Sequence, residues 1–213
     1  MSDHDFRFEP QPGLPAPLPE GEALLWQGSP DAKALAREAF KINWITGYLL
    51  LIAVWRGGAA FADGGLARSL AVFLPYLVLA LAGYAVIRVL AWASARAAIY
   101  SITSNRVILR IGAALQVTYT VPFTRIATAS ADIRPVSGTG TIALELTEGA
   151  QLSYLVLWPH LRPGFARKVQ PALRCIPDAA RVARILADAA QTRLNEPVVT
   201  RRPTAAGEPI AAE

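Results

Sequence analysis

The sequence predicts a membrane protein: a two-helix transmembrane hairpin plus a small cytoplasmic β-barrel or sheet that is closed by one C-terminal α-helix. Three patterns carry this prediction. Two long apolar runs lie in the first half of the chain, a period-two alternation follows them, and an amphipathic helical stretch lies near the end. The composition agrees, because the 213 residues are 53% hydrophobic and only 17% charged.

The N-terminal segment, residues 1–38, is polar and rich in proline. The stretch PQPGLPAPLP at residues 10–19 favours an extended, polyproline-like linker on the cytoplasmic side. A cleavable signal peptide needs an apolar run close to the N-terminus, and this segment lacks one. We therefore expect entry into the membrane through internal spans.

The membrane part is predicted at residues 39–96, with the first span at about 42–61. The run INWITGYLLLIAVW is followed by Arg56 and then by GGAAFA. Extension to Phe61 gives about 20 residues, which is enough to cross a hydrocarbon core of about 30 Å. Two interpretations of Arg56 stay open: its side chain snorkels to the headgroups, or it makes an intramembrane contact with a partner helix or a cofactor carboxylate.

The second span is predicted at about residues 70–92, where LAVFLPYLVLALAGYAVI carries no charge. The link RGGAAFADGGLARS is short and rich in glycine, which fits a helical hairpin. Basic residues precede the first span and follow the second, and they place both termini of this multi-pass protein in the cytoplasm. They are Lys33, Arg37 and Lys41 before the spans and Arg88, Arg96, Arg106 and Arg110 after them.

The two spans are interpreted as an anchor and a helix-docking surface. Neither contains Asp, Glu or His, which proton relays and intramembrane haem or pigment ligation require. Small residues would allow close helix approach, or they simply face lipid. These residues are Gly47, Gly57 and Gly58 in the first span and Ala82, Gly83 and Ala85 in the second.

A sheet-forming domain is predicted at residues 98–194. YSITSNRVILR forms two short strands around a turn at Ser104–Asn105, and alternation also predicts strands at 142–146 and 152–158. Weaker strands are predicted in QVTYTVPF and TRIATASADI. This spacing is typical of a small antiparallel sheet or barrel.

One amphipathic helix is predicted from Asp178, after Pro177. Its apolar face consists of Val182, Ile185, Leu186 and Ala189. Such a helix can close the open end of a small barrel by burying this face. The tail, residues 195–213, is unpatterned and is predicted to be disordered.

Strands followed by one helix is the order of a pleckstrin-homology (PH) domain. Tyr100, Thr103 and Arg106 match the Tyr-x-x-Thr-x-x-Arg hairpin that opens PH-like domains in bacterial membrane proteins. GEALLWQGSPD, GTGTIAL, YLVLWPHLRPG and PALRCIPDAARVARILADA extend the likeness. With these motifs the chain, from about residue 8 to 190, resembles the PuhB family of photosynthetic complex assembly proteins from purple phototrophic bacteria.

The resemblance implies a non-catalytic assembly factor for the photosynthetic reaction centre and core light-harvesting complex 1. It implies a location in the bacterial cytoplasmic membrane, inner or intracytoplasmic, and partners among the reaction-centre and core-antenna membrane subunits. It also leaves self-association as a homodimer open. The chain would then be a membrane-anchored adaptor that holds newly inserted subunits, since tethering raises local concentration. The alternative is a general membrane-anchored PH-like lipid- or protein-binding module unrelated to photosynthesis.

Two sets of residues are candidate contacts. In WPHLRPG, the side chains of Trp158, His160 and Arg162 are candidates for contact with a partner protein. The competing interpretation places Trp158 in the core, with the two prolines shaping a turn. Candidates for contact with an anionic lipid surface are Arg88, Arg96 and Arg106.

No catalytic, cofactor or metal site is predicted. The chain has one cysteine, Cys175, and two histidines that lie far apart, so no cluster has metal-ligand spacing. Nucleotide-binding, hydrolase and metalloprotease motifs are missing. The net charge of +5 is assigned to contact with lipid rather than nucleic acid, because no nucleic-acid-binding motif accompanies it.

Overall fold

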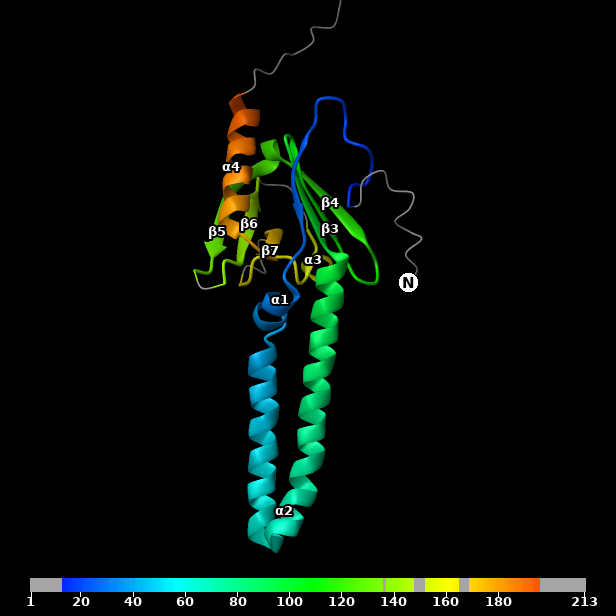
Figure 1. The fold of residues 1–213 in the computed structure, drawn as a ribbon, viewed down its shortest axis with the longest axis vertical. Coiled ribbons are helices and arrows are strands. Elements are labelled where there is room, and N and C mark those ends of the chain that lie inside the picture. The colour runs from blue at the N-terminus through cyan, green and yellow to red at the C-terminus, as the bar shows by residue number, and fades with distance from the viewer. Residues whose placement is uncertain (1–12, 136, 148–151, 165–168, 196–213) are drawn as a thin grey trace, which may run out of the picture.

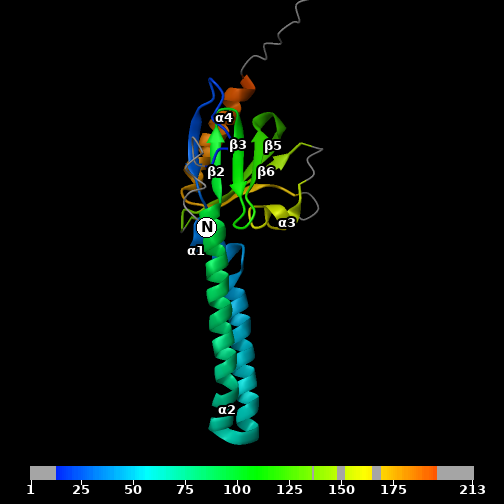
Figure 2. The same cartoon turned by 90° about the vertical axis from the view of Figure 1, so that its right-hand side faces the viewer.

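A helical hairpin projects from one end of a β-rich domain in the computed structural model, which describes residues 13–135, 137–147, 152–164 and 169–195 (Figure 1). The first part of the N-terminal segment, residues 1–12, and all but the first residue of the predicted tail lie outside the described residues. A view at right angles shows that the two arms of the hairpin stay side by side (Figure 2).

Within the described residues, the domain contains two antiparallel sheets. The first has the strand order β1-β2-β3-β4 and the second β5-β6-β7. The strands are β1 (Leu24–Gly28), β2 (Ile99–Thr103), β3 (Arg106–Ile111), β4 (Val117–Pro122), β5 (Ile126–Ile133), β6 (Gly140–Leu146) and β7 (Ala172–Ile176). A short 3-10 turn, η2 (Phe123–Arg125), connects the two sheets.

Helix α4 (Ala179–Asn195) packs on the sheets and completes the core. Its buried face includes Val182, Leu186 and Ala189, which join buried side chains of both sheets in one cluster. The predicted helix and its apolar face are confirmed. The strand pair at residues 100–110 is confirmed as well, as β2 and β3.

The domain begins before the hairpin. β1 pairs with β2, with Leu24 opposite Thr103 and Gly28 opposite Tyr100. The hairpin is therefore inserted between the first and second strands, and the region expected to be the domain, residues 98–194, lacks its first strand. The segment 1–38 is also more than a linker, because it contains β1 and helix α1 (Ala32–Glu38). Asp31 starts α1 by accepting a 2.6 Å hydrogen bond from the Ala34 N–H.

The hairpin is α2 (Ile42–Ala97), whose helical backbone is interrupted at Gly64 and Gly65. Gly65 has φ +66°, a conformation that glycine adopts without a steric penalty, and the chain reverses there. The arms, residues 42–63 and 66–97, are longer than the spans expected at 42–61 and 70–92. By length and composition, α2 can cross a membrane: its most apolar window has a mean hydropathy of 2.3 and is 6% buried.

Small residues bring the two arms together. A Cβ on Gly57 would lie 3.2 Å from the Cβ of Phe73, and one on Gly83 would lie 3.3 Å from a methyl of Leu49. The Ser69 hydroxyl also donates a 2.8 Å hydrogen bond to the Gly57 carbonyl. Gly47 and Gly58 face open space, so of the four glycines for which close approach or exposure to lipid stayed open, Gly57 and Gly83 take part in the contact.

The strand expected at residues 152–158 is wrong. Residues 154–157 of this segment form α3 (Tyr154–Leu157), a single helical turn in which the N–H groups of Leu157 and Trp158 donate hydrogen bonds to the carbonyls of Ser153 and Tyr154. The last strand is instead β7, whose five residues are all buried. A strand that is buried on both faces shows no polar–apolar alternation, which explains why the pattern missed it.

Candidate functional site

The base of the hairpin is joined to the domain on both sides. Only Ala98 separates the end of α2 from β2, and this residue is fully buried. On the other side, Leu35 of α1, the helix that precedes the first arm, packs with Ala95 of the second arm and Cys175 of β7. Because both arms are held, the direction of the hairpin fixes the orientation of the domain.

Arg174 ties three segments together at this base. Its guanidinium donates hydrogen bonds to the carbonyls of Glu38 (3.1 Å), Pro159 (3.1 Å) and Leu161 (3.4 Å). Buried cations require such partners. The side chain therefore holds the end of α1, the loop after α3, and β7 in one arrangement.

A thiol and a carboxylate extend this network. Cys175 donates through its Sγ to a Glu38 carboxylate oxygen at 3.3 Å, and the other oxygen lies 3.0 Å from Nε of Arg134. Burial, reinforced by the Glu38 charge, raises the pKa of the Cys175 thiol to about 12. The thiol is therefore protonated and unreactive at neutral pH.

His160 is a buried structural residue. Its Nδ1 lies 2.6 Å from the Tyr100 hydroxyl, and only 2% of its surface is exposed. Burial, with a smaller effect of the Arg174 charge, lowers the pKa of His160 to about 4, so the ring is neutral at pH 7. The Tyr100 oxygen also accepts a hydrogen bond from the backbone N–H of Arg174 at 3.4 Å.

A second polar cluster lies at the end of the domain remote from the hairpin. The Arg106 guanidinium forms a two-point ion pair with the Glu22 carboxylate, in which Nε donates at 2.8 Å. The Thr103 hydroxyl donates to the same carboxylate at 2.6 Å. These bonds outweigh the effect of burial and hold the pKa of Glu22 below its usual range.

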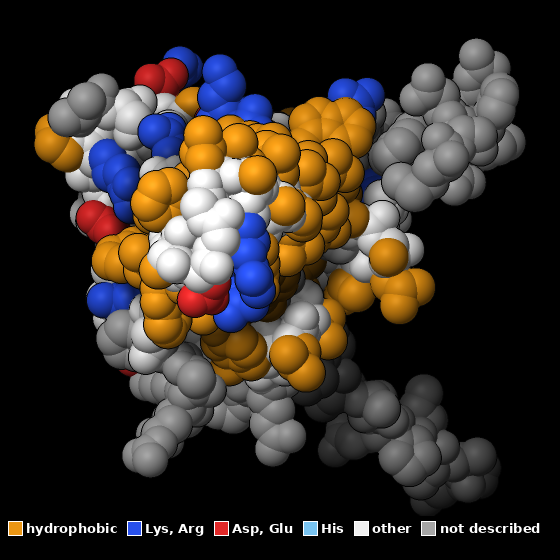
Figure 3. All heavy atoms as spheres, turned by 90° about the horizontal axis from the view of Figure 1, so that it is seen from below, with side chains coloured by type: hydrophobic (Ala, Val, Ile, Leu, Met, Phe, Trp, Pro, Cys, Tyr) orange, Lys and Arg blue, Asp and Glu red, His pale blue; other side chains and the backbone are white. Residues whose placement is uncertain are grey.

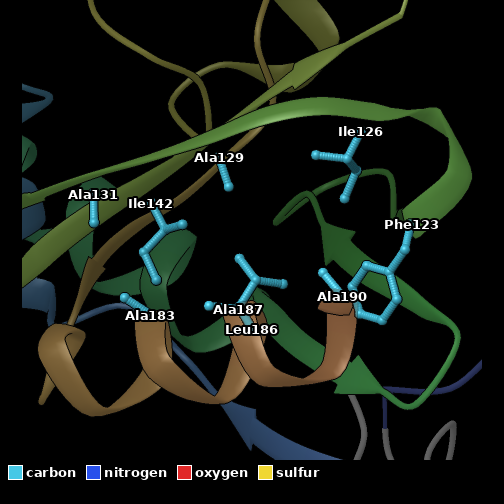
Figure 4. A pocket seen from close by; sticks show the side chains of 9 residues that line it. All are labelled: Phe123, Ile126, Ala129, Ala131, Ile142, Ala183, Leu186, Ala187 and Ala190. Carbon is cyan, nitrogen blue, oxygen red and sulfur yellow. The ribbon is translucent and has the colours of Figure 1, made fainter. Parts of the chain in front are cut away.

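An apolar groove of about 120 Å³ lies between α4 and the second sheet (Figure 4). Beside it, β5 is the outer strand of its sheet and, within the described residues, pairs only with β6. An outer strand next to an apolar groove can accept an extended peptide as an added strand. The groove is lined by Phe123, Ile126, Ala129, Ala131, Ile142, Ala183, Leu186, Ala187 and Ala190.

The predicted partner-contact residues do not form one exposed surface. The Trp158 ring is partly exposed and packs edge-on against Phe40, with ring centres 4.9 Å apart. His160 is buried, and Arg162 donates to the Gln170 side chain at 3.1 Å. His160 is therefore not accessible for the predicted contact with a partner protein, and the three side chains are not exposed together.

The arginines proposed to contact lipid or a partner in the membrane separate into two groups. Arg56 and Arg88 are exposed on the arms of the hairpin, and Arg96 lies 5.8 Å from the ring centre of Trp92 near the base. Arg106 is at the remote end of the domain, paired with Glu22, so a contact with a bilayer beside the hairpin is not available to it.

Sequence reasoning missed the Arg174 network, the Glu22 cluster and the groove. One usable signal existed: Arg174 lies inside the otherwise apolar run ALRCI, and an arginine in such a run needs buried acceptors. Within the described part of the chain, no three His, Cys, Asp or Glu residues come close enough to bind a metal ion.

Known protein families, proteins and structures are similar to this chain. The sequence profile described as a bacterial PH domain matches residues 44–190. An uncharacterized 23.7 kDa protein from the puhA 5' region of Rhodobacter capsulatus is 55% identical over 214 residues, covering 100% of both chains. A crystal structure of a DUF1696 family protein with a pleckstrin-homology domain, from Shewanella loihica PV-4, is 12% identical. It covers 44% of this chain and 71% of that chain, with a TM-score of 0.29.

Proposed function

Because the chain belongs to the bacterial PH domain family, we propose that it is a non-catalytic, membrane-anchored adaptor. In this proposal the hairpin spans the cytoplasmic membrane twice, with both termini in the cytoplasm. The domain then holds cytoplasmic segments of newly inserted membrane subunits beside the bilayer. The insertion of the hairpin between β1 and β2 supports this arrangement most directly, because it locks the domain to its anchor at both ends.

The dimensions of the hairpin support membrane anchorage. The contacts of Gly57 with Phe73 and of Leu49 with Gly83 put the apolar runs at 42–61 and 70–87 side by side. A run of about 20 residues has the length of the hydrocarbon core. Arg56 lies near the hairpin tip, within snorkelling reach of the far headgroups.

The exposed surface of the hairpin also supports membrane anchorage. Large apolar side chains cover it, including Leu51, Val54, Val78 and Leu81, each more than half exposed. Seen along its axis from the tip, the hairpin is almost entirely hydrophobic on its flanks (Figure 3). An apolar surface of this extent is stable in lipid and not in water.

The proposed clients are reaction-centre and core-antenna subunits. Support comes from the 55% identical relative, which is encoded in the 5' region of the reaction-centre gene puhA. The resemblance to the PuhB family supports the same clients. The groove beside β5 is the proposed site for an extended client segment, since backbone hydrogen bonds to a strand edge tolerate different side chains.

The test is the near-infrared absorption spectrum of a phototrophic host that lacks this protein. We expect loss of the reaction-centre and core-antenna bands, with recovery when the intact gene is returned. Ala129→Trp should fill the groove and fail to restore the bands. Thr128→Trp is the matched control, since neighbouring strand residues point to opposite faces.

Each result leads to a distinct conclusion. Restoration by both variants would remove the groove from the proposal and leave the assembly role. A spectrum that does not change when the protein is absent would refute the photosynthetic role. The general membrane-anchored PH-like module, binding lipid or another protein, would then be the better description.

A further inference from the structure

We propose that the face of the domain beside the hairpin base is a lipid-contacting surface, in which Leu115 and the exposed residues of α3 enter the headgroup layer. This inference rests on the proposed membrane anchorage. It assigns the lipid contact to two apolar projections of the domain, the β3–β4 loop and α3, and not to Arg106.

The first projection is the loop 112–116 between β3 and β4. Arg110 pairs with Ile99, the first residue of β2, so this loop lies at the end of the sheet where α2 enters. Leu115 is 82% exposed at this end of the sheet. Gly112 shapes the turn with φ +106°, a conformation that side-chain-bearing residues rarely adopt.

The second projection is α3. The contact between Trp158 and Phe40 places the end of α3 beside the residues that lead into the first arm of α2. Leu157 is buried and fixes the turn to the domain, whereas Leu155 is 83% exposed. Tyr154 and Val156 flank it and are also exposed. Both views show α3 at the hairpin end of the domain (Figures 1 and 2).

The anchor brings these projections to the level of the headgroups. Trp92 is exposed on the second arm, and tryptophan side chains favour the membrane interface. From Trp92 to Ala97 the helix rises by about 7.5 Å. The loop 112–116 lies beyond Ile111 and Val117, the last pair of β3 and β4, on the side of the sheet from which α2 enters (Figure 1).

Charge complements the apolar side chains. The view from the hairpin side shows basic side chains, with a few acidic ones among them, on part of the domain surface around the hairpin (Figure 3). Exposed Lys33, Arg37 and Lys41 lie on or next to α1, and Arg96 lies in the last turn of α2. Apolar tips within a basic surround fit an anionic lipid interface. A protein partner is the less favoured occupant, because the short connections of α2 to α1 and to β2 hold this face toward the bilayer.

The experiment measures how deeply single positions lie in the membrane. The full-length protein carries a spin label at Leu115→Cys or Leu155→Cys and is reconstituted into phosphatidylethanolamine–phosphatidylglycerol vesicles. Collision with oxygen, which concentrates in lipid, is compared with collision with a water-soluble nickel complex. Wild type is the unlabelled blank, because its Cys175 is buried. Leu79→Cys reports the middle of the hairpin, and Gln191→Cys reports the remote end of α4.

We expect the ratio of oxygen to nickel collision at positions 115 and 155 to exceed that at 191 several-fold, and to be largest at position 79. Equal ratios at 115, 155 and 191, with a large ratio at 79, would overturn this inference and leave the anchorage intact. Shielding of 115 and 155 from both reagents would also overturn it, in favour of a second copy covering the face. A water-accessible position 79 would overturn the membrane anchorage itself.

Discussion

Replacing Glu22 by glutamine should loosen β1 from the rest of its sheet. The Glu22 carboxylate precedes β1 and accepts hydrogen bonds from Arg106 and Thr103, which lie on either side of the β2–β3 turn. Glutamine keeps the shape of the side chain but removes its charge. The substitution therefore tests whether this ion pair holds the N-terminal segment to the domain across the inserted hairpin.

The expected cost is about 2 kcal/mol. Hydrogen bonds to charged groups contribute about 1.5–3 kcal/mol when lost. We take a value near the lower end, because the Arg106 side chain is 31% exposed and water partly screens the pair. Since each 1.4 kcal/mol is a factor of ten, about 2 kcal/mol corresponds to roughly 30-fold more frequent opening of β1.

Hydrogen–deuterium exchange of the full-length protein in detergent measures this opening at those backbone amides of β1 that hydrogen-bond to β2. Exposed Glu20 supplies the control variant, Glu20→Gln, which should exchange like wild type. The pKa of Glu22 is lowered on folding, so its contribution is complete above the ordinary carboxyl value of about 4.5 and is lost as the pH falls further. Glu22→Gln should lack this acid-dependent loss.

Unchanged exchange in Glu22→Gln at neutral pH would refute this reasoning. It would mean that the backbone pairing of β1 with β2 holds the strand without help from the ion pair. Equal acceleration in Glu20→Gln would also contradict it, because a general charge effect would then replace the specific contact.

Three further variants test other parts of the structure. Because the pKa of His160 falls from 6.5 to about 4 on folding, the free energy of unfolding should drop by about 3 kcal/mol as the pH falls from 6.5 to 4. In thermal melts, His160→Phe should reduce this dependence of stability on pH. An unchanged dependence in the variant would contradict the burial of a neutral His160 as its cause. Gly112→Ala should cost about 1–3 kcal/mol in the same melts, since its Cβ would lie 1.9 Å from the Leu115 carbonyl oxygen, and an unchanged melting temperature would contradict this contact. Gly57→Leu should separate the arms and lower the melting temperature in detergent, whereas Gly58→Leu, which faces open space, should not; equal effects would disprove the assigned helix faces.

Much of the fold was predictable because its signals are local. The two apolar runs, the glycine-rich reversal, the β2–β3 hairpin and α4 each involve residues that are close in sequence, so periodicity and turn residues suffice to find them. α3 was mistaken for a strand because one helical turn is too short to establish a helical period. β7 was missed because burial on both faces removes the alternation that marks a strand.

The candidate site depends on contacts between distant parts of the chain. Glu22 meets Arg106 across a separation of 84 residues, and Arg174 meets the Glu38 carbonyl across 136. No local sequence pattern identifies such distant partners. The N-terminal segment was therefore predicted to be a proline-rich linker, although it supplies the first strand of the sheet. His160 likewise reads as a surface residue in a proline-rich loop, and only the packing of Tyr100 and Arg174 around it makes it a buried, neutral ring.

The sequence by itself determined that this chain has a hydrophobic hairpin, a small antiparallel sheet and one closing helix, since each follows from composition and period. Tertiary structure alone decided that the hairpin is inserted inside the domain, that α4 and β5 line a groove, and that Leu115 and α3 lie at the end of the domain beside the hairpin base. The physical reason is that strand pairing and side-chain packing are chosen by the whole chain, whereas helical and strand periodicity are set by neighbouring residues.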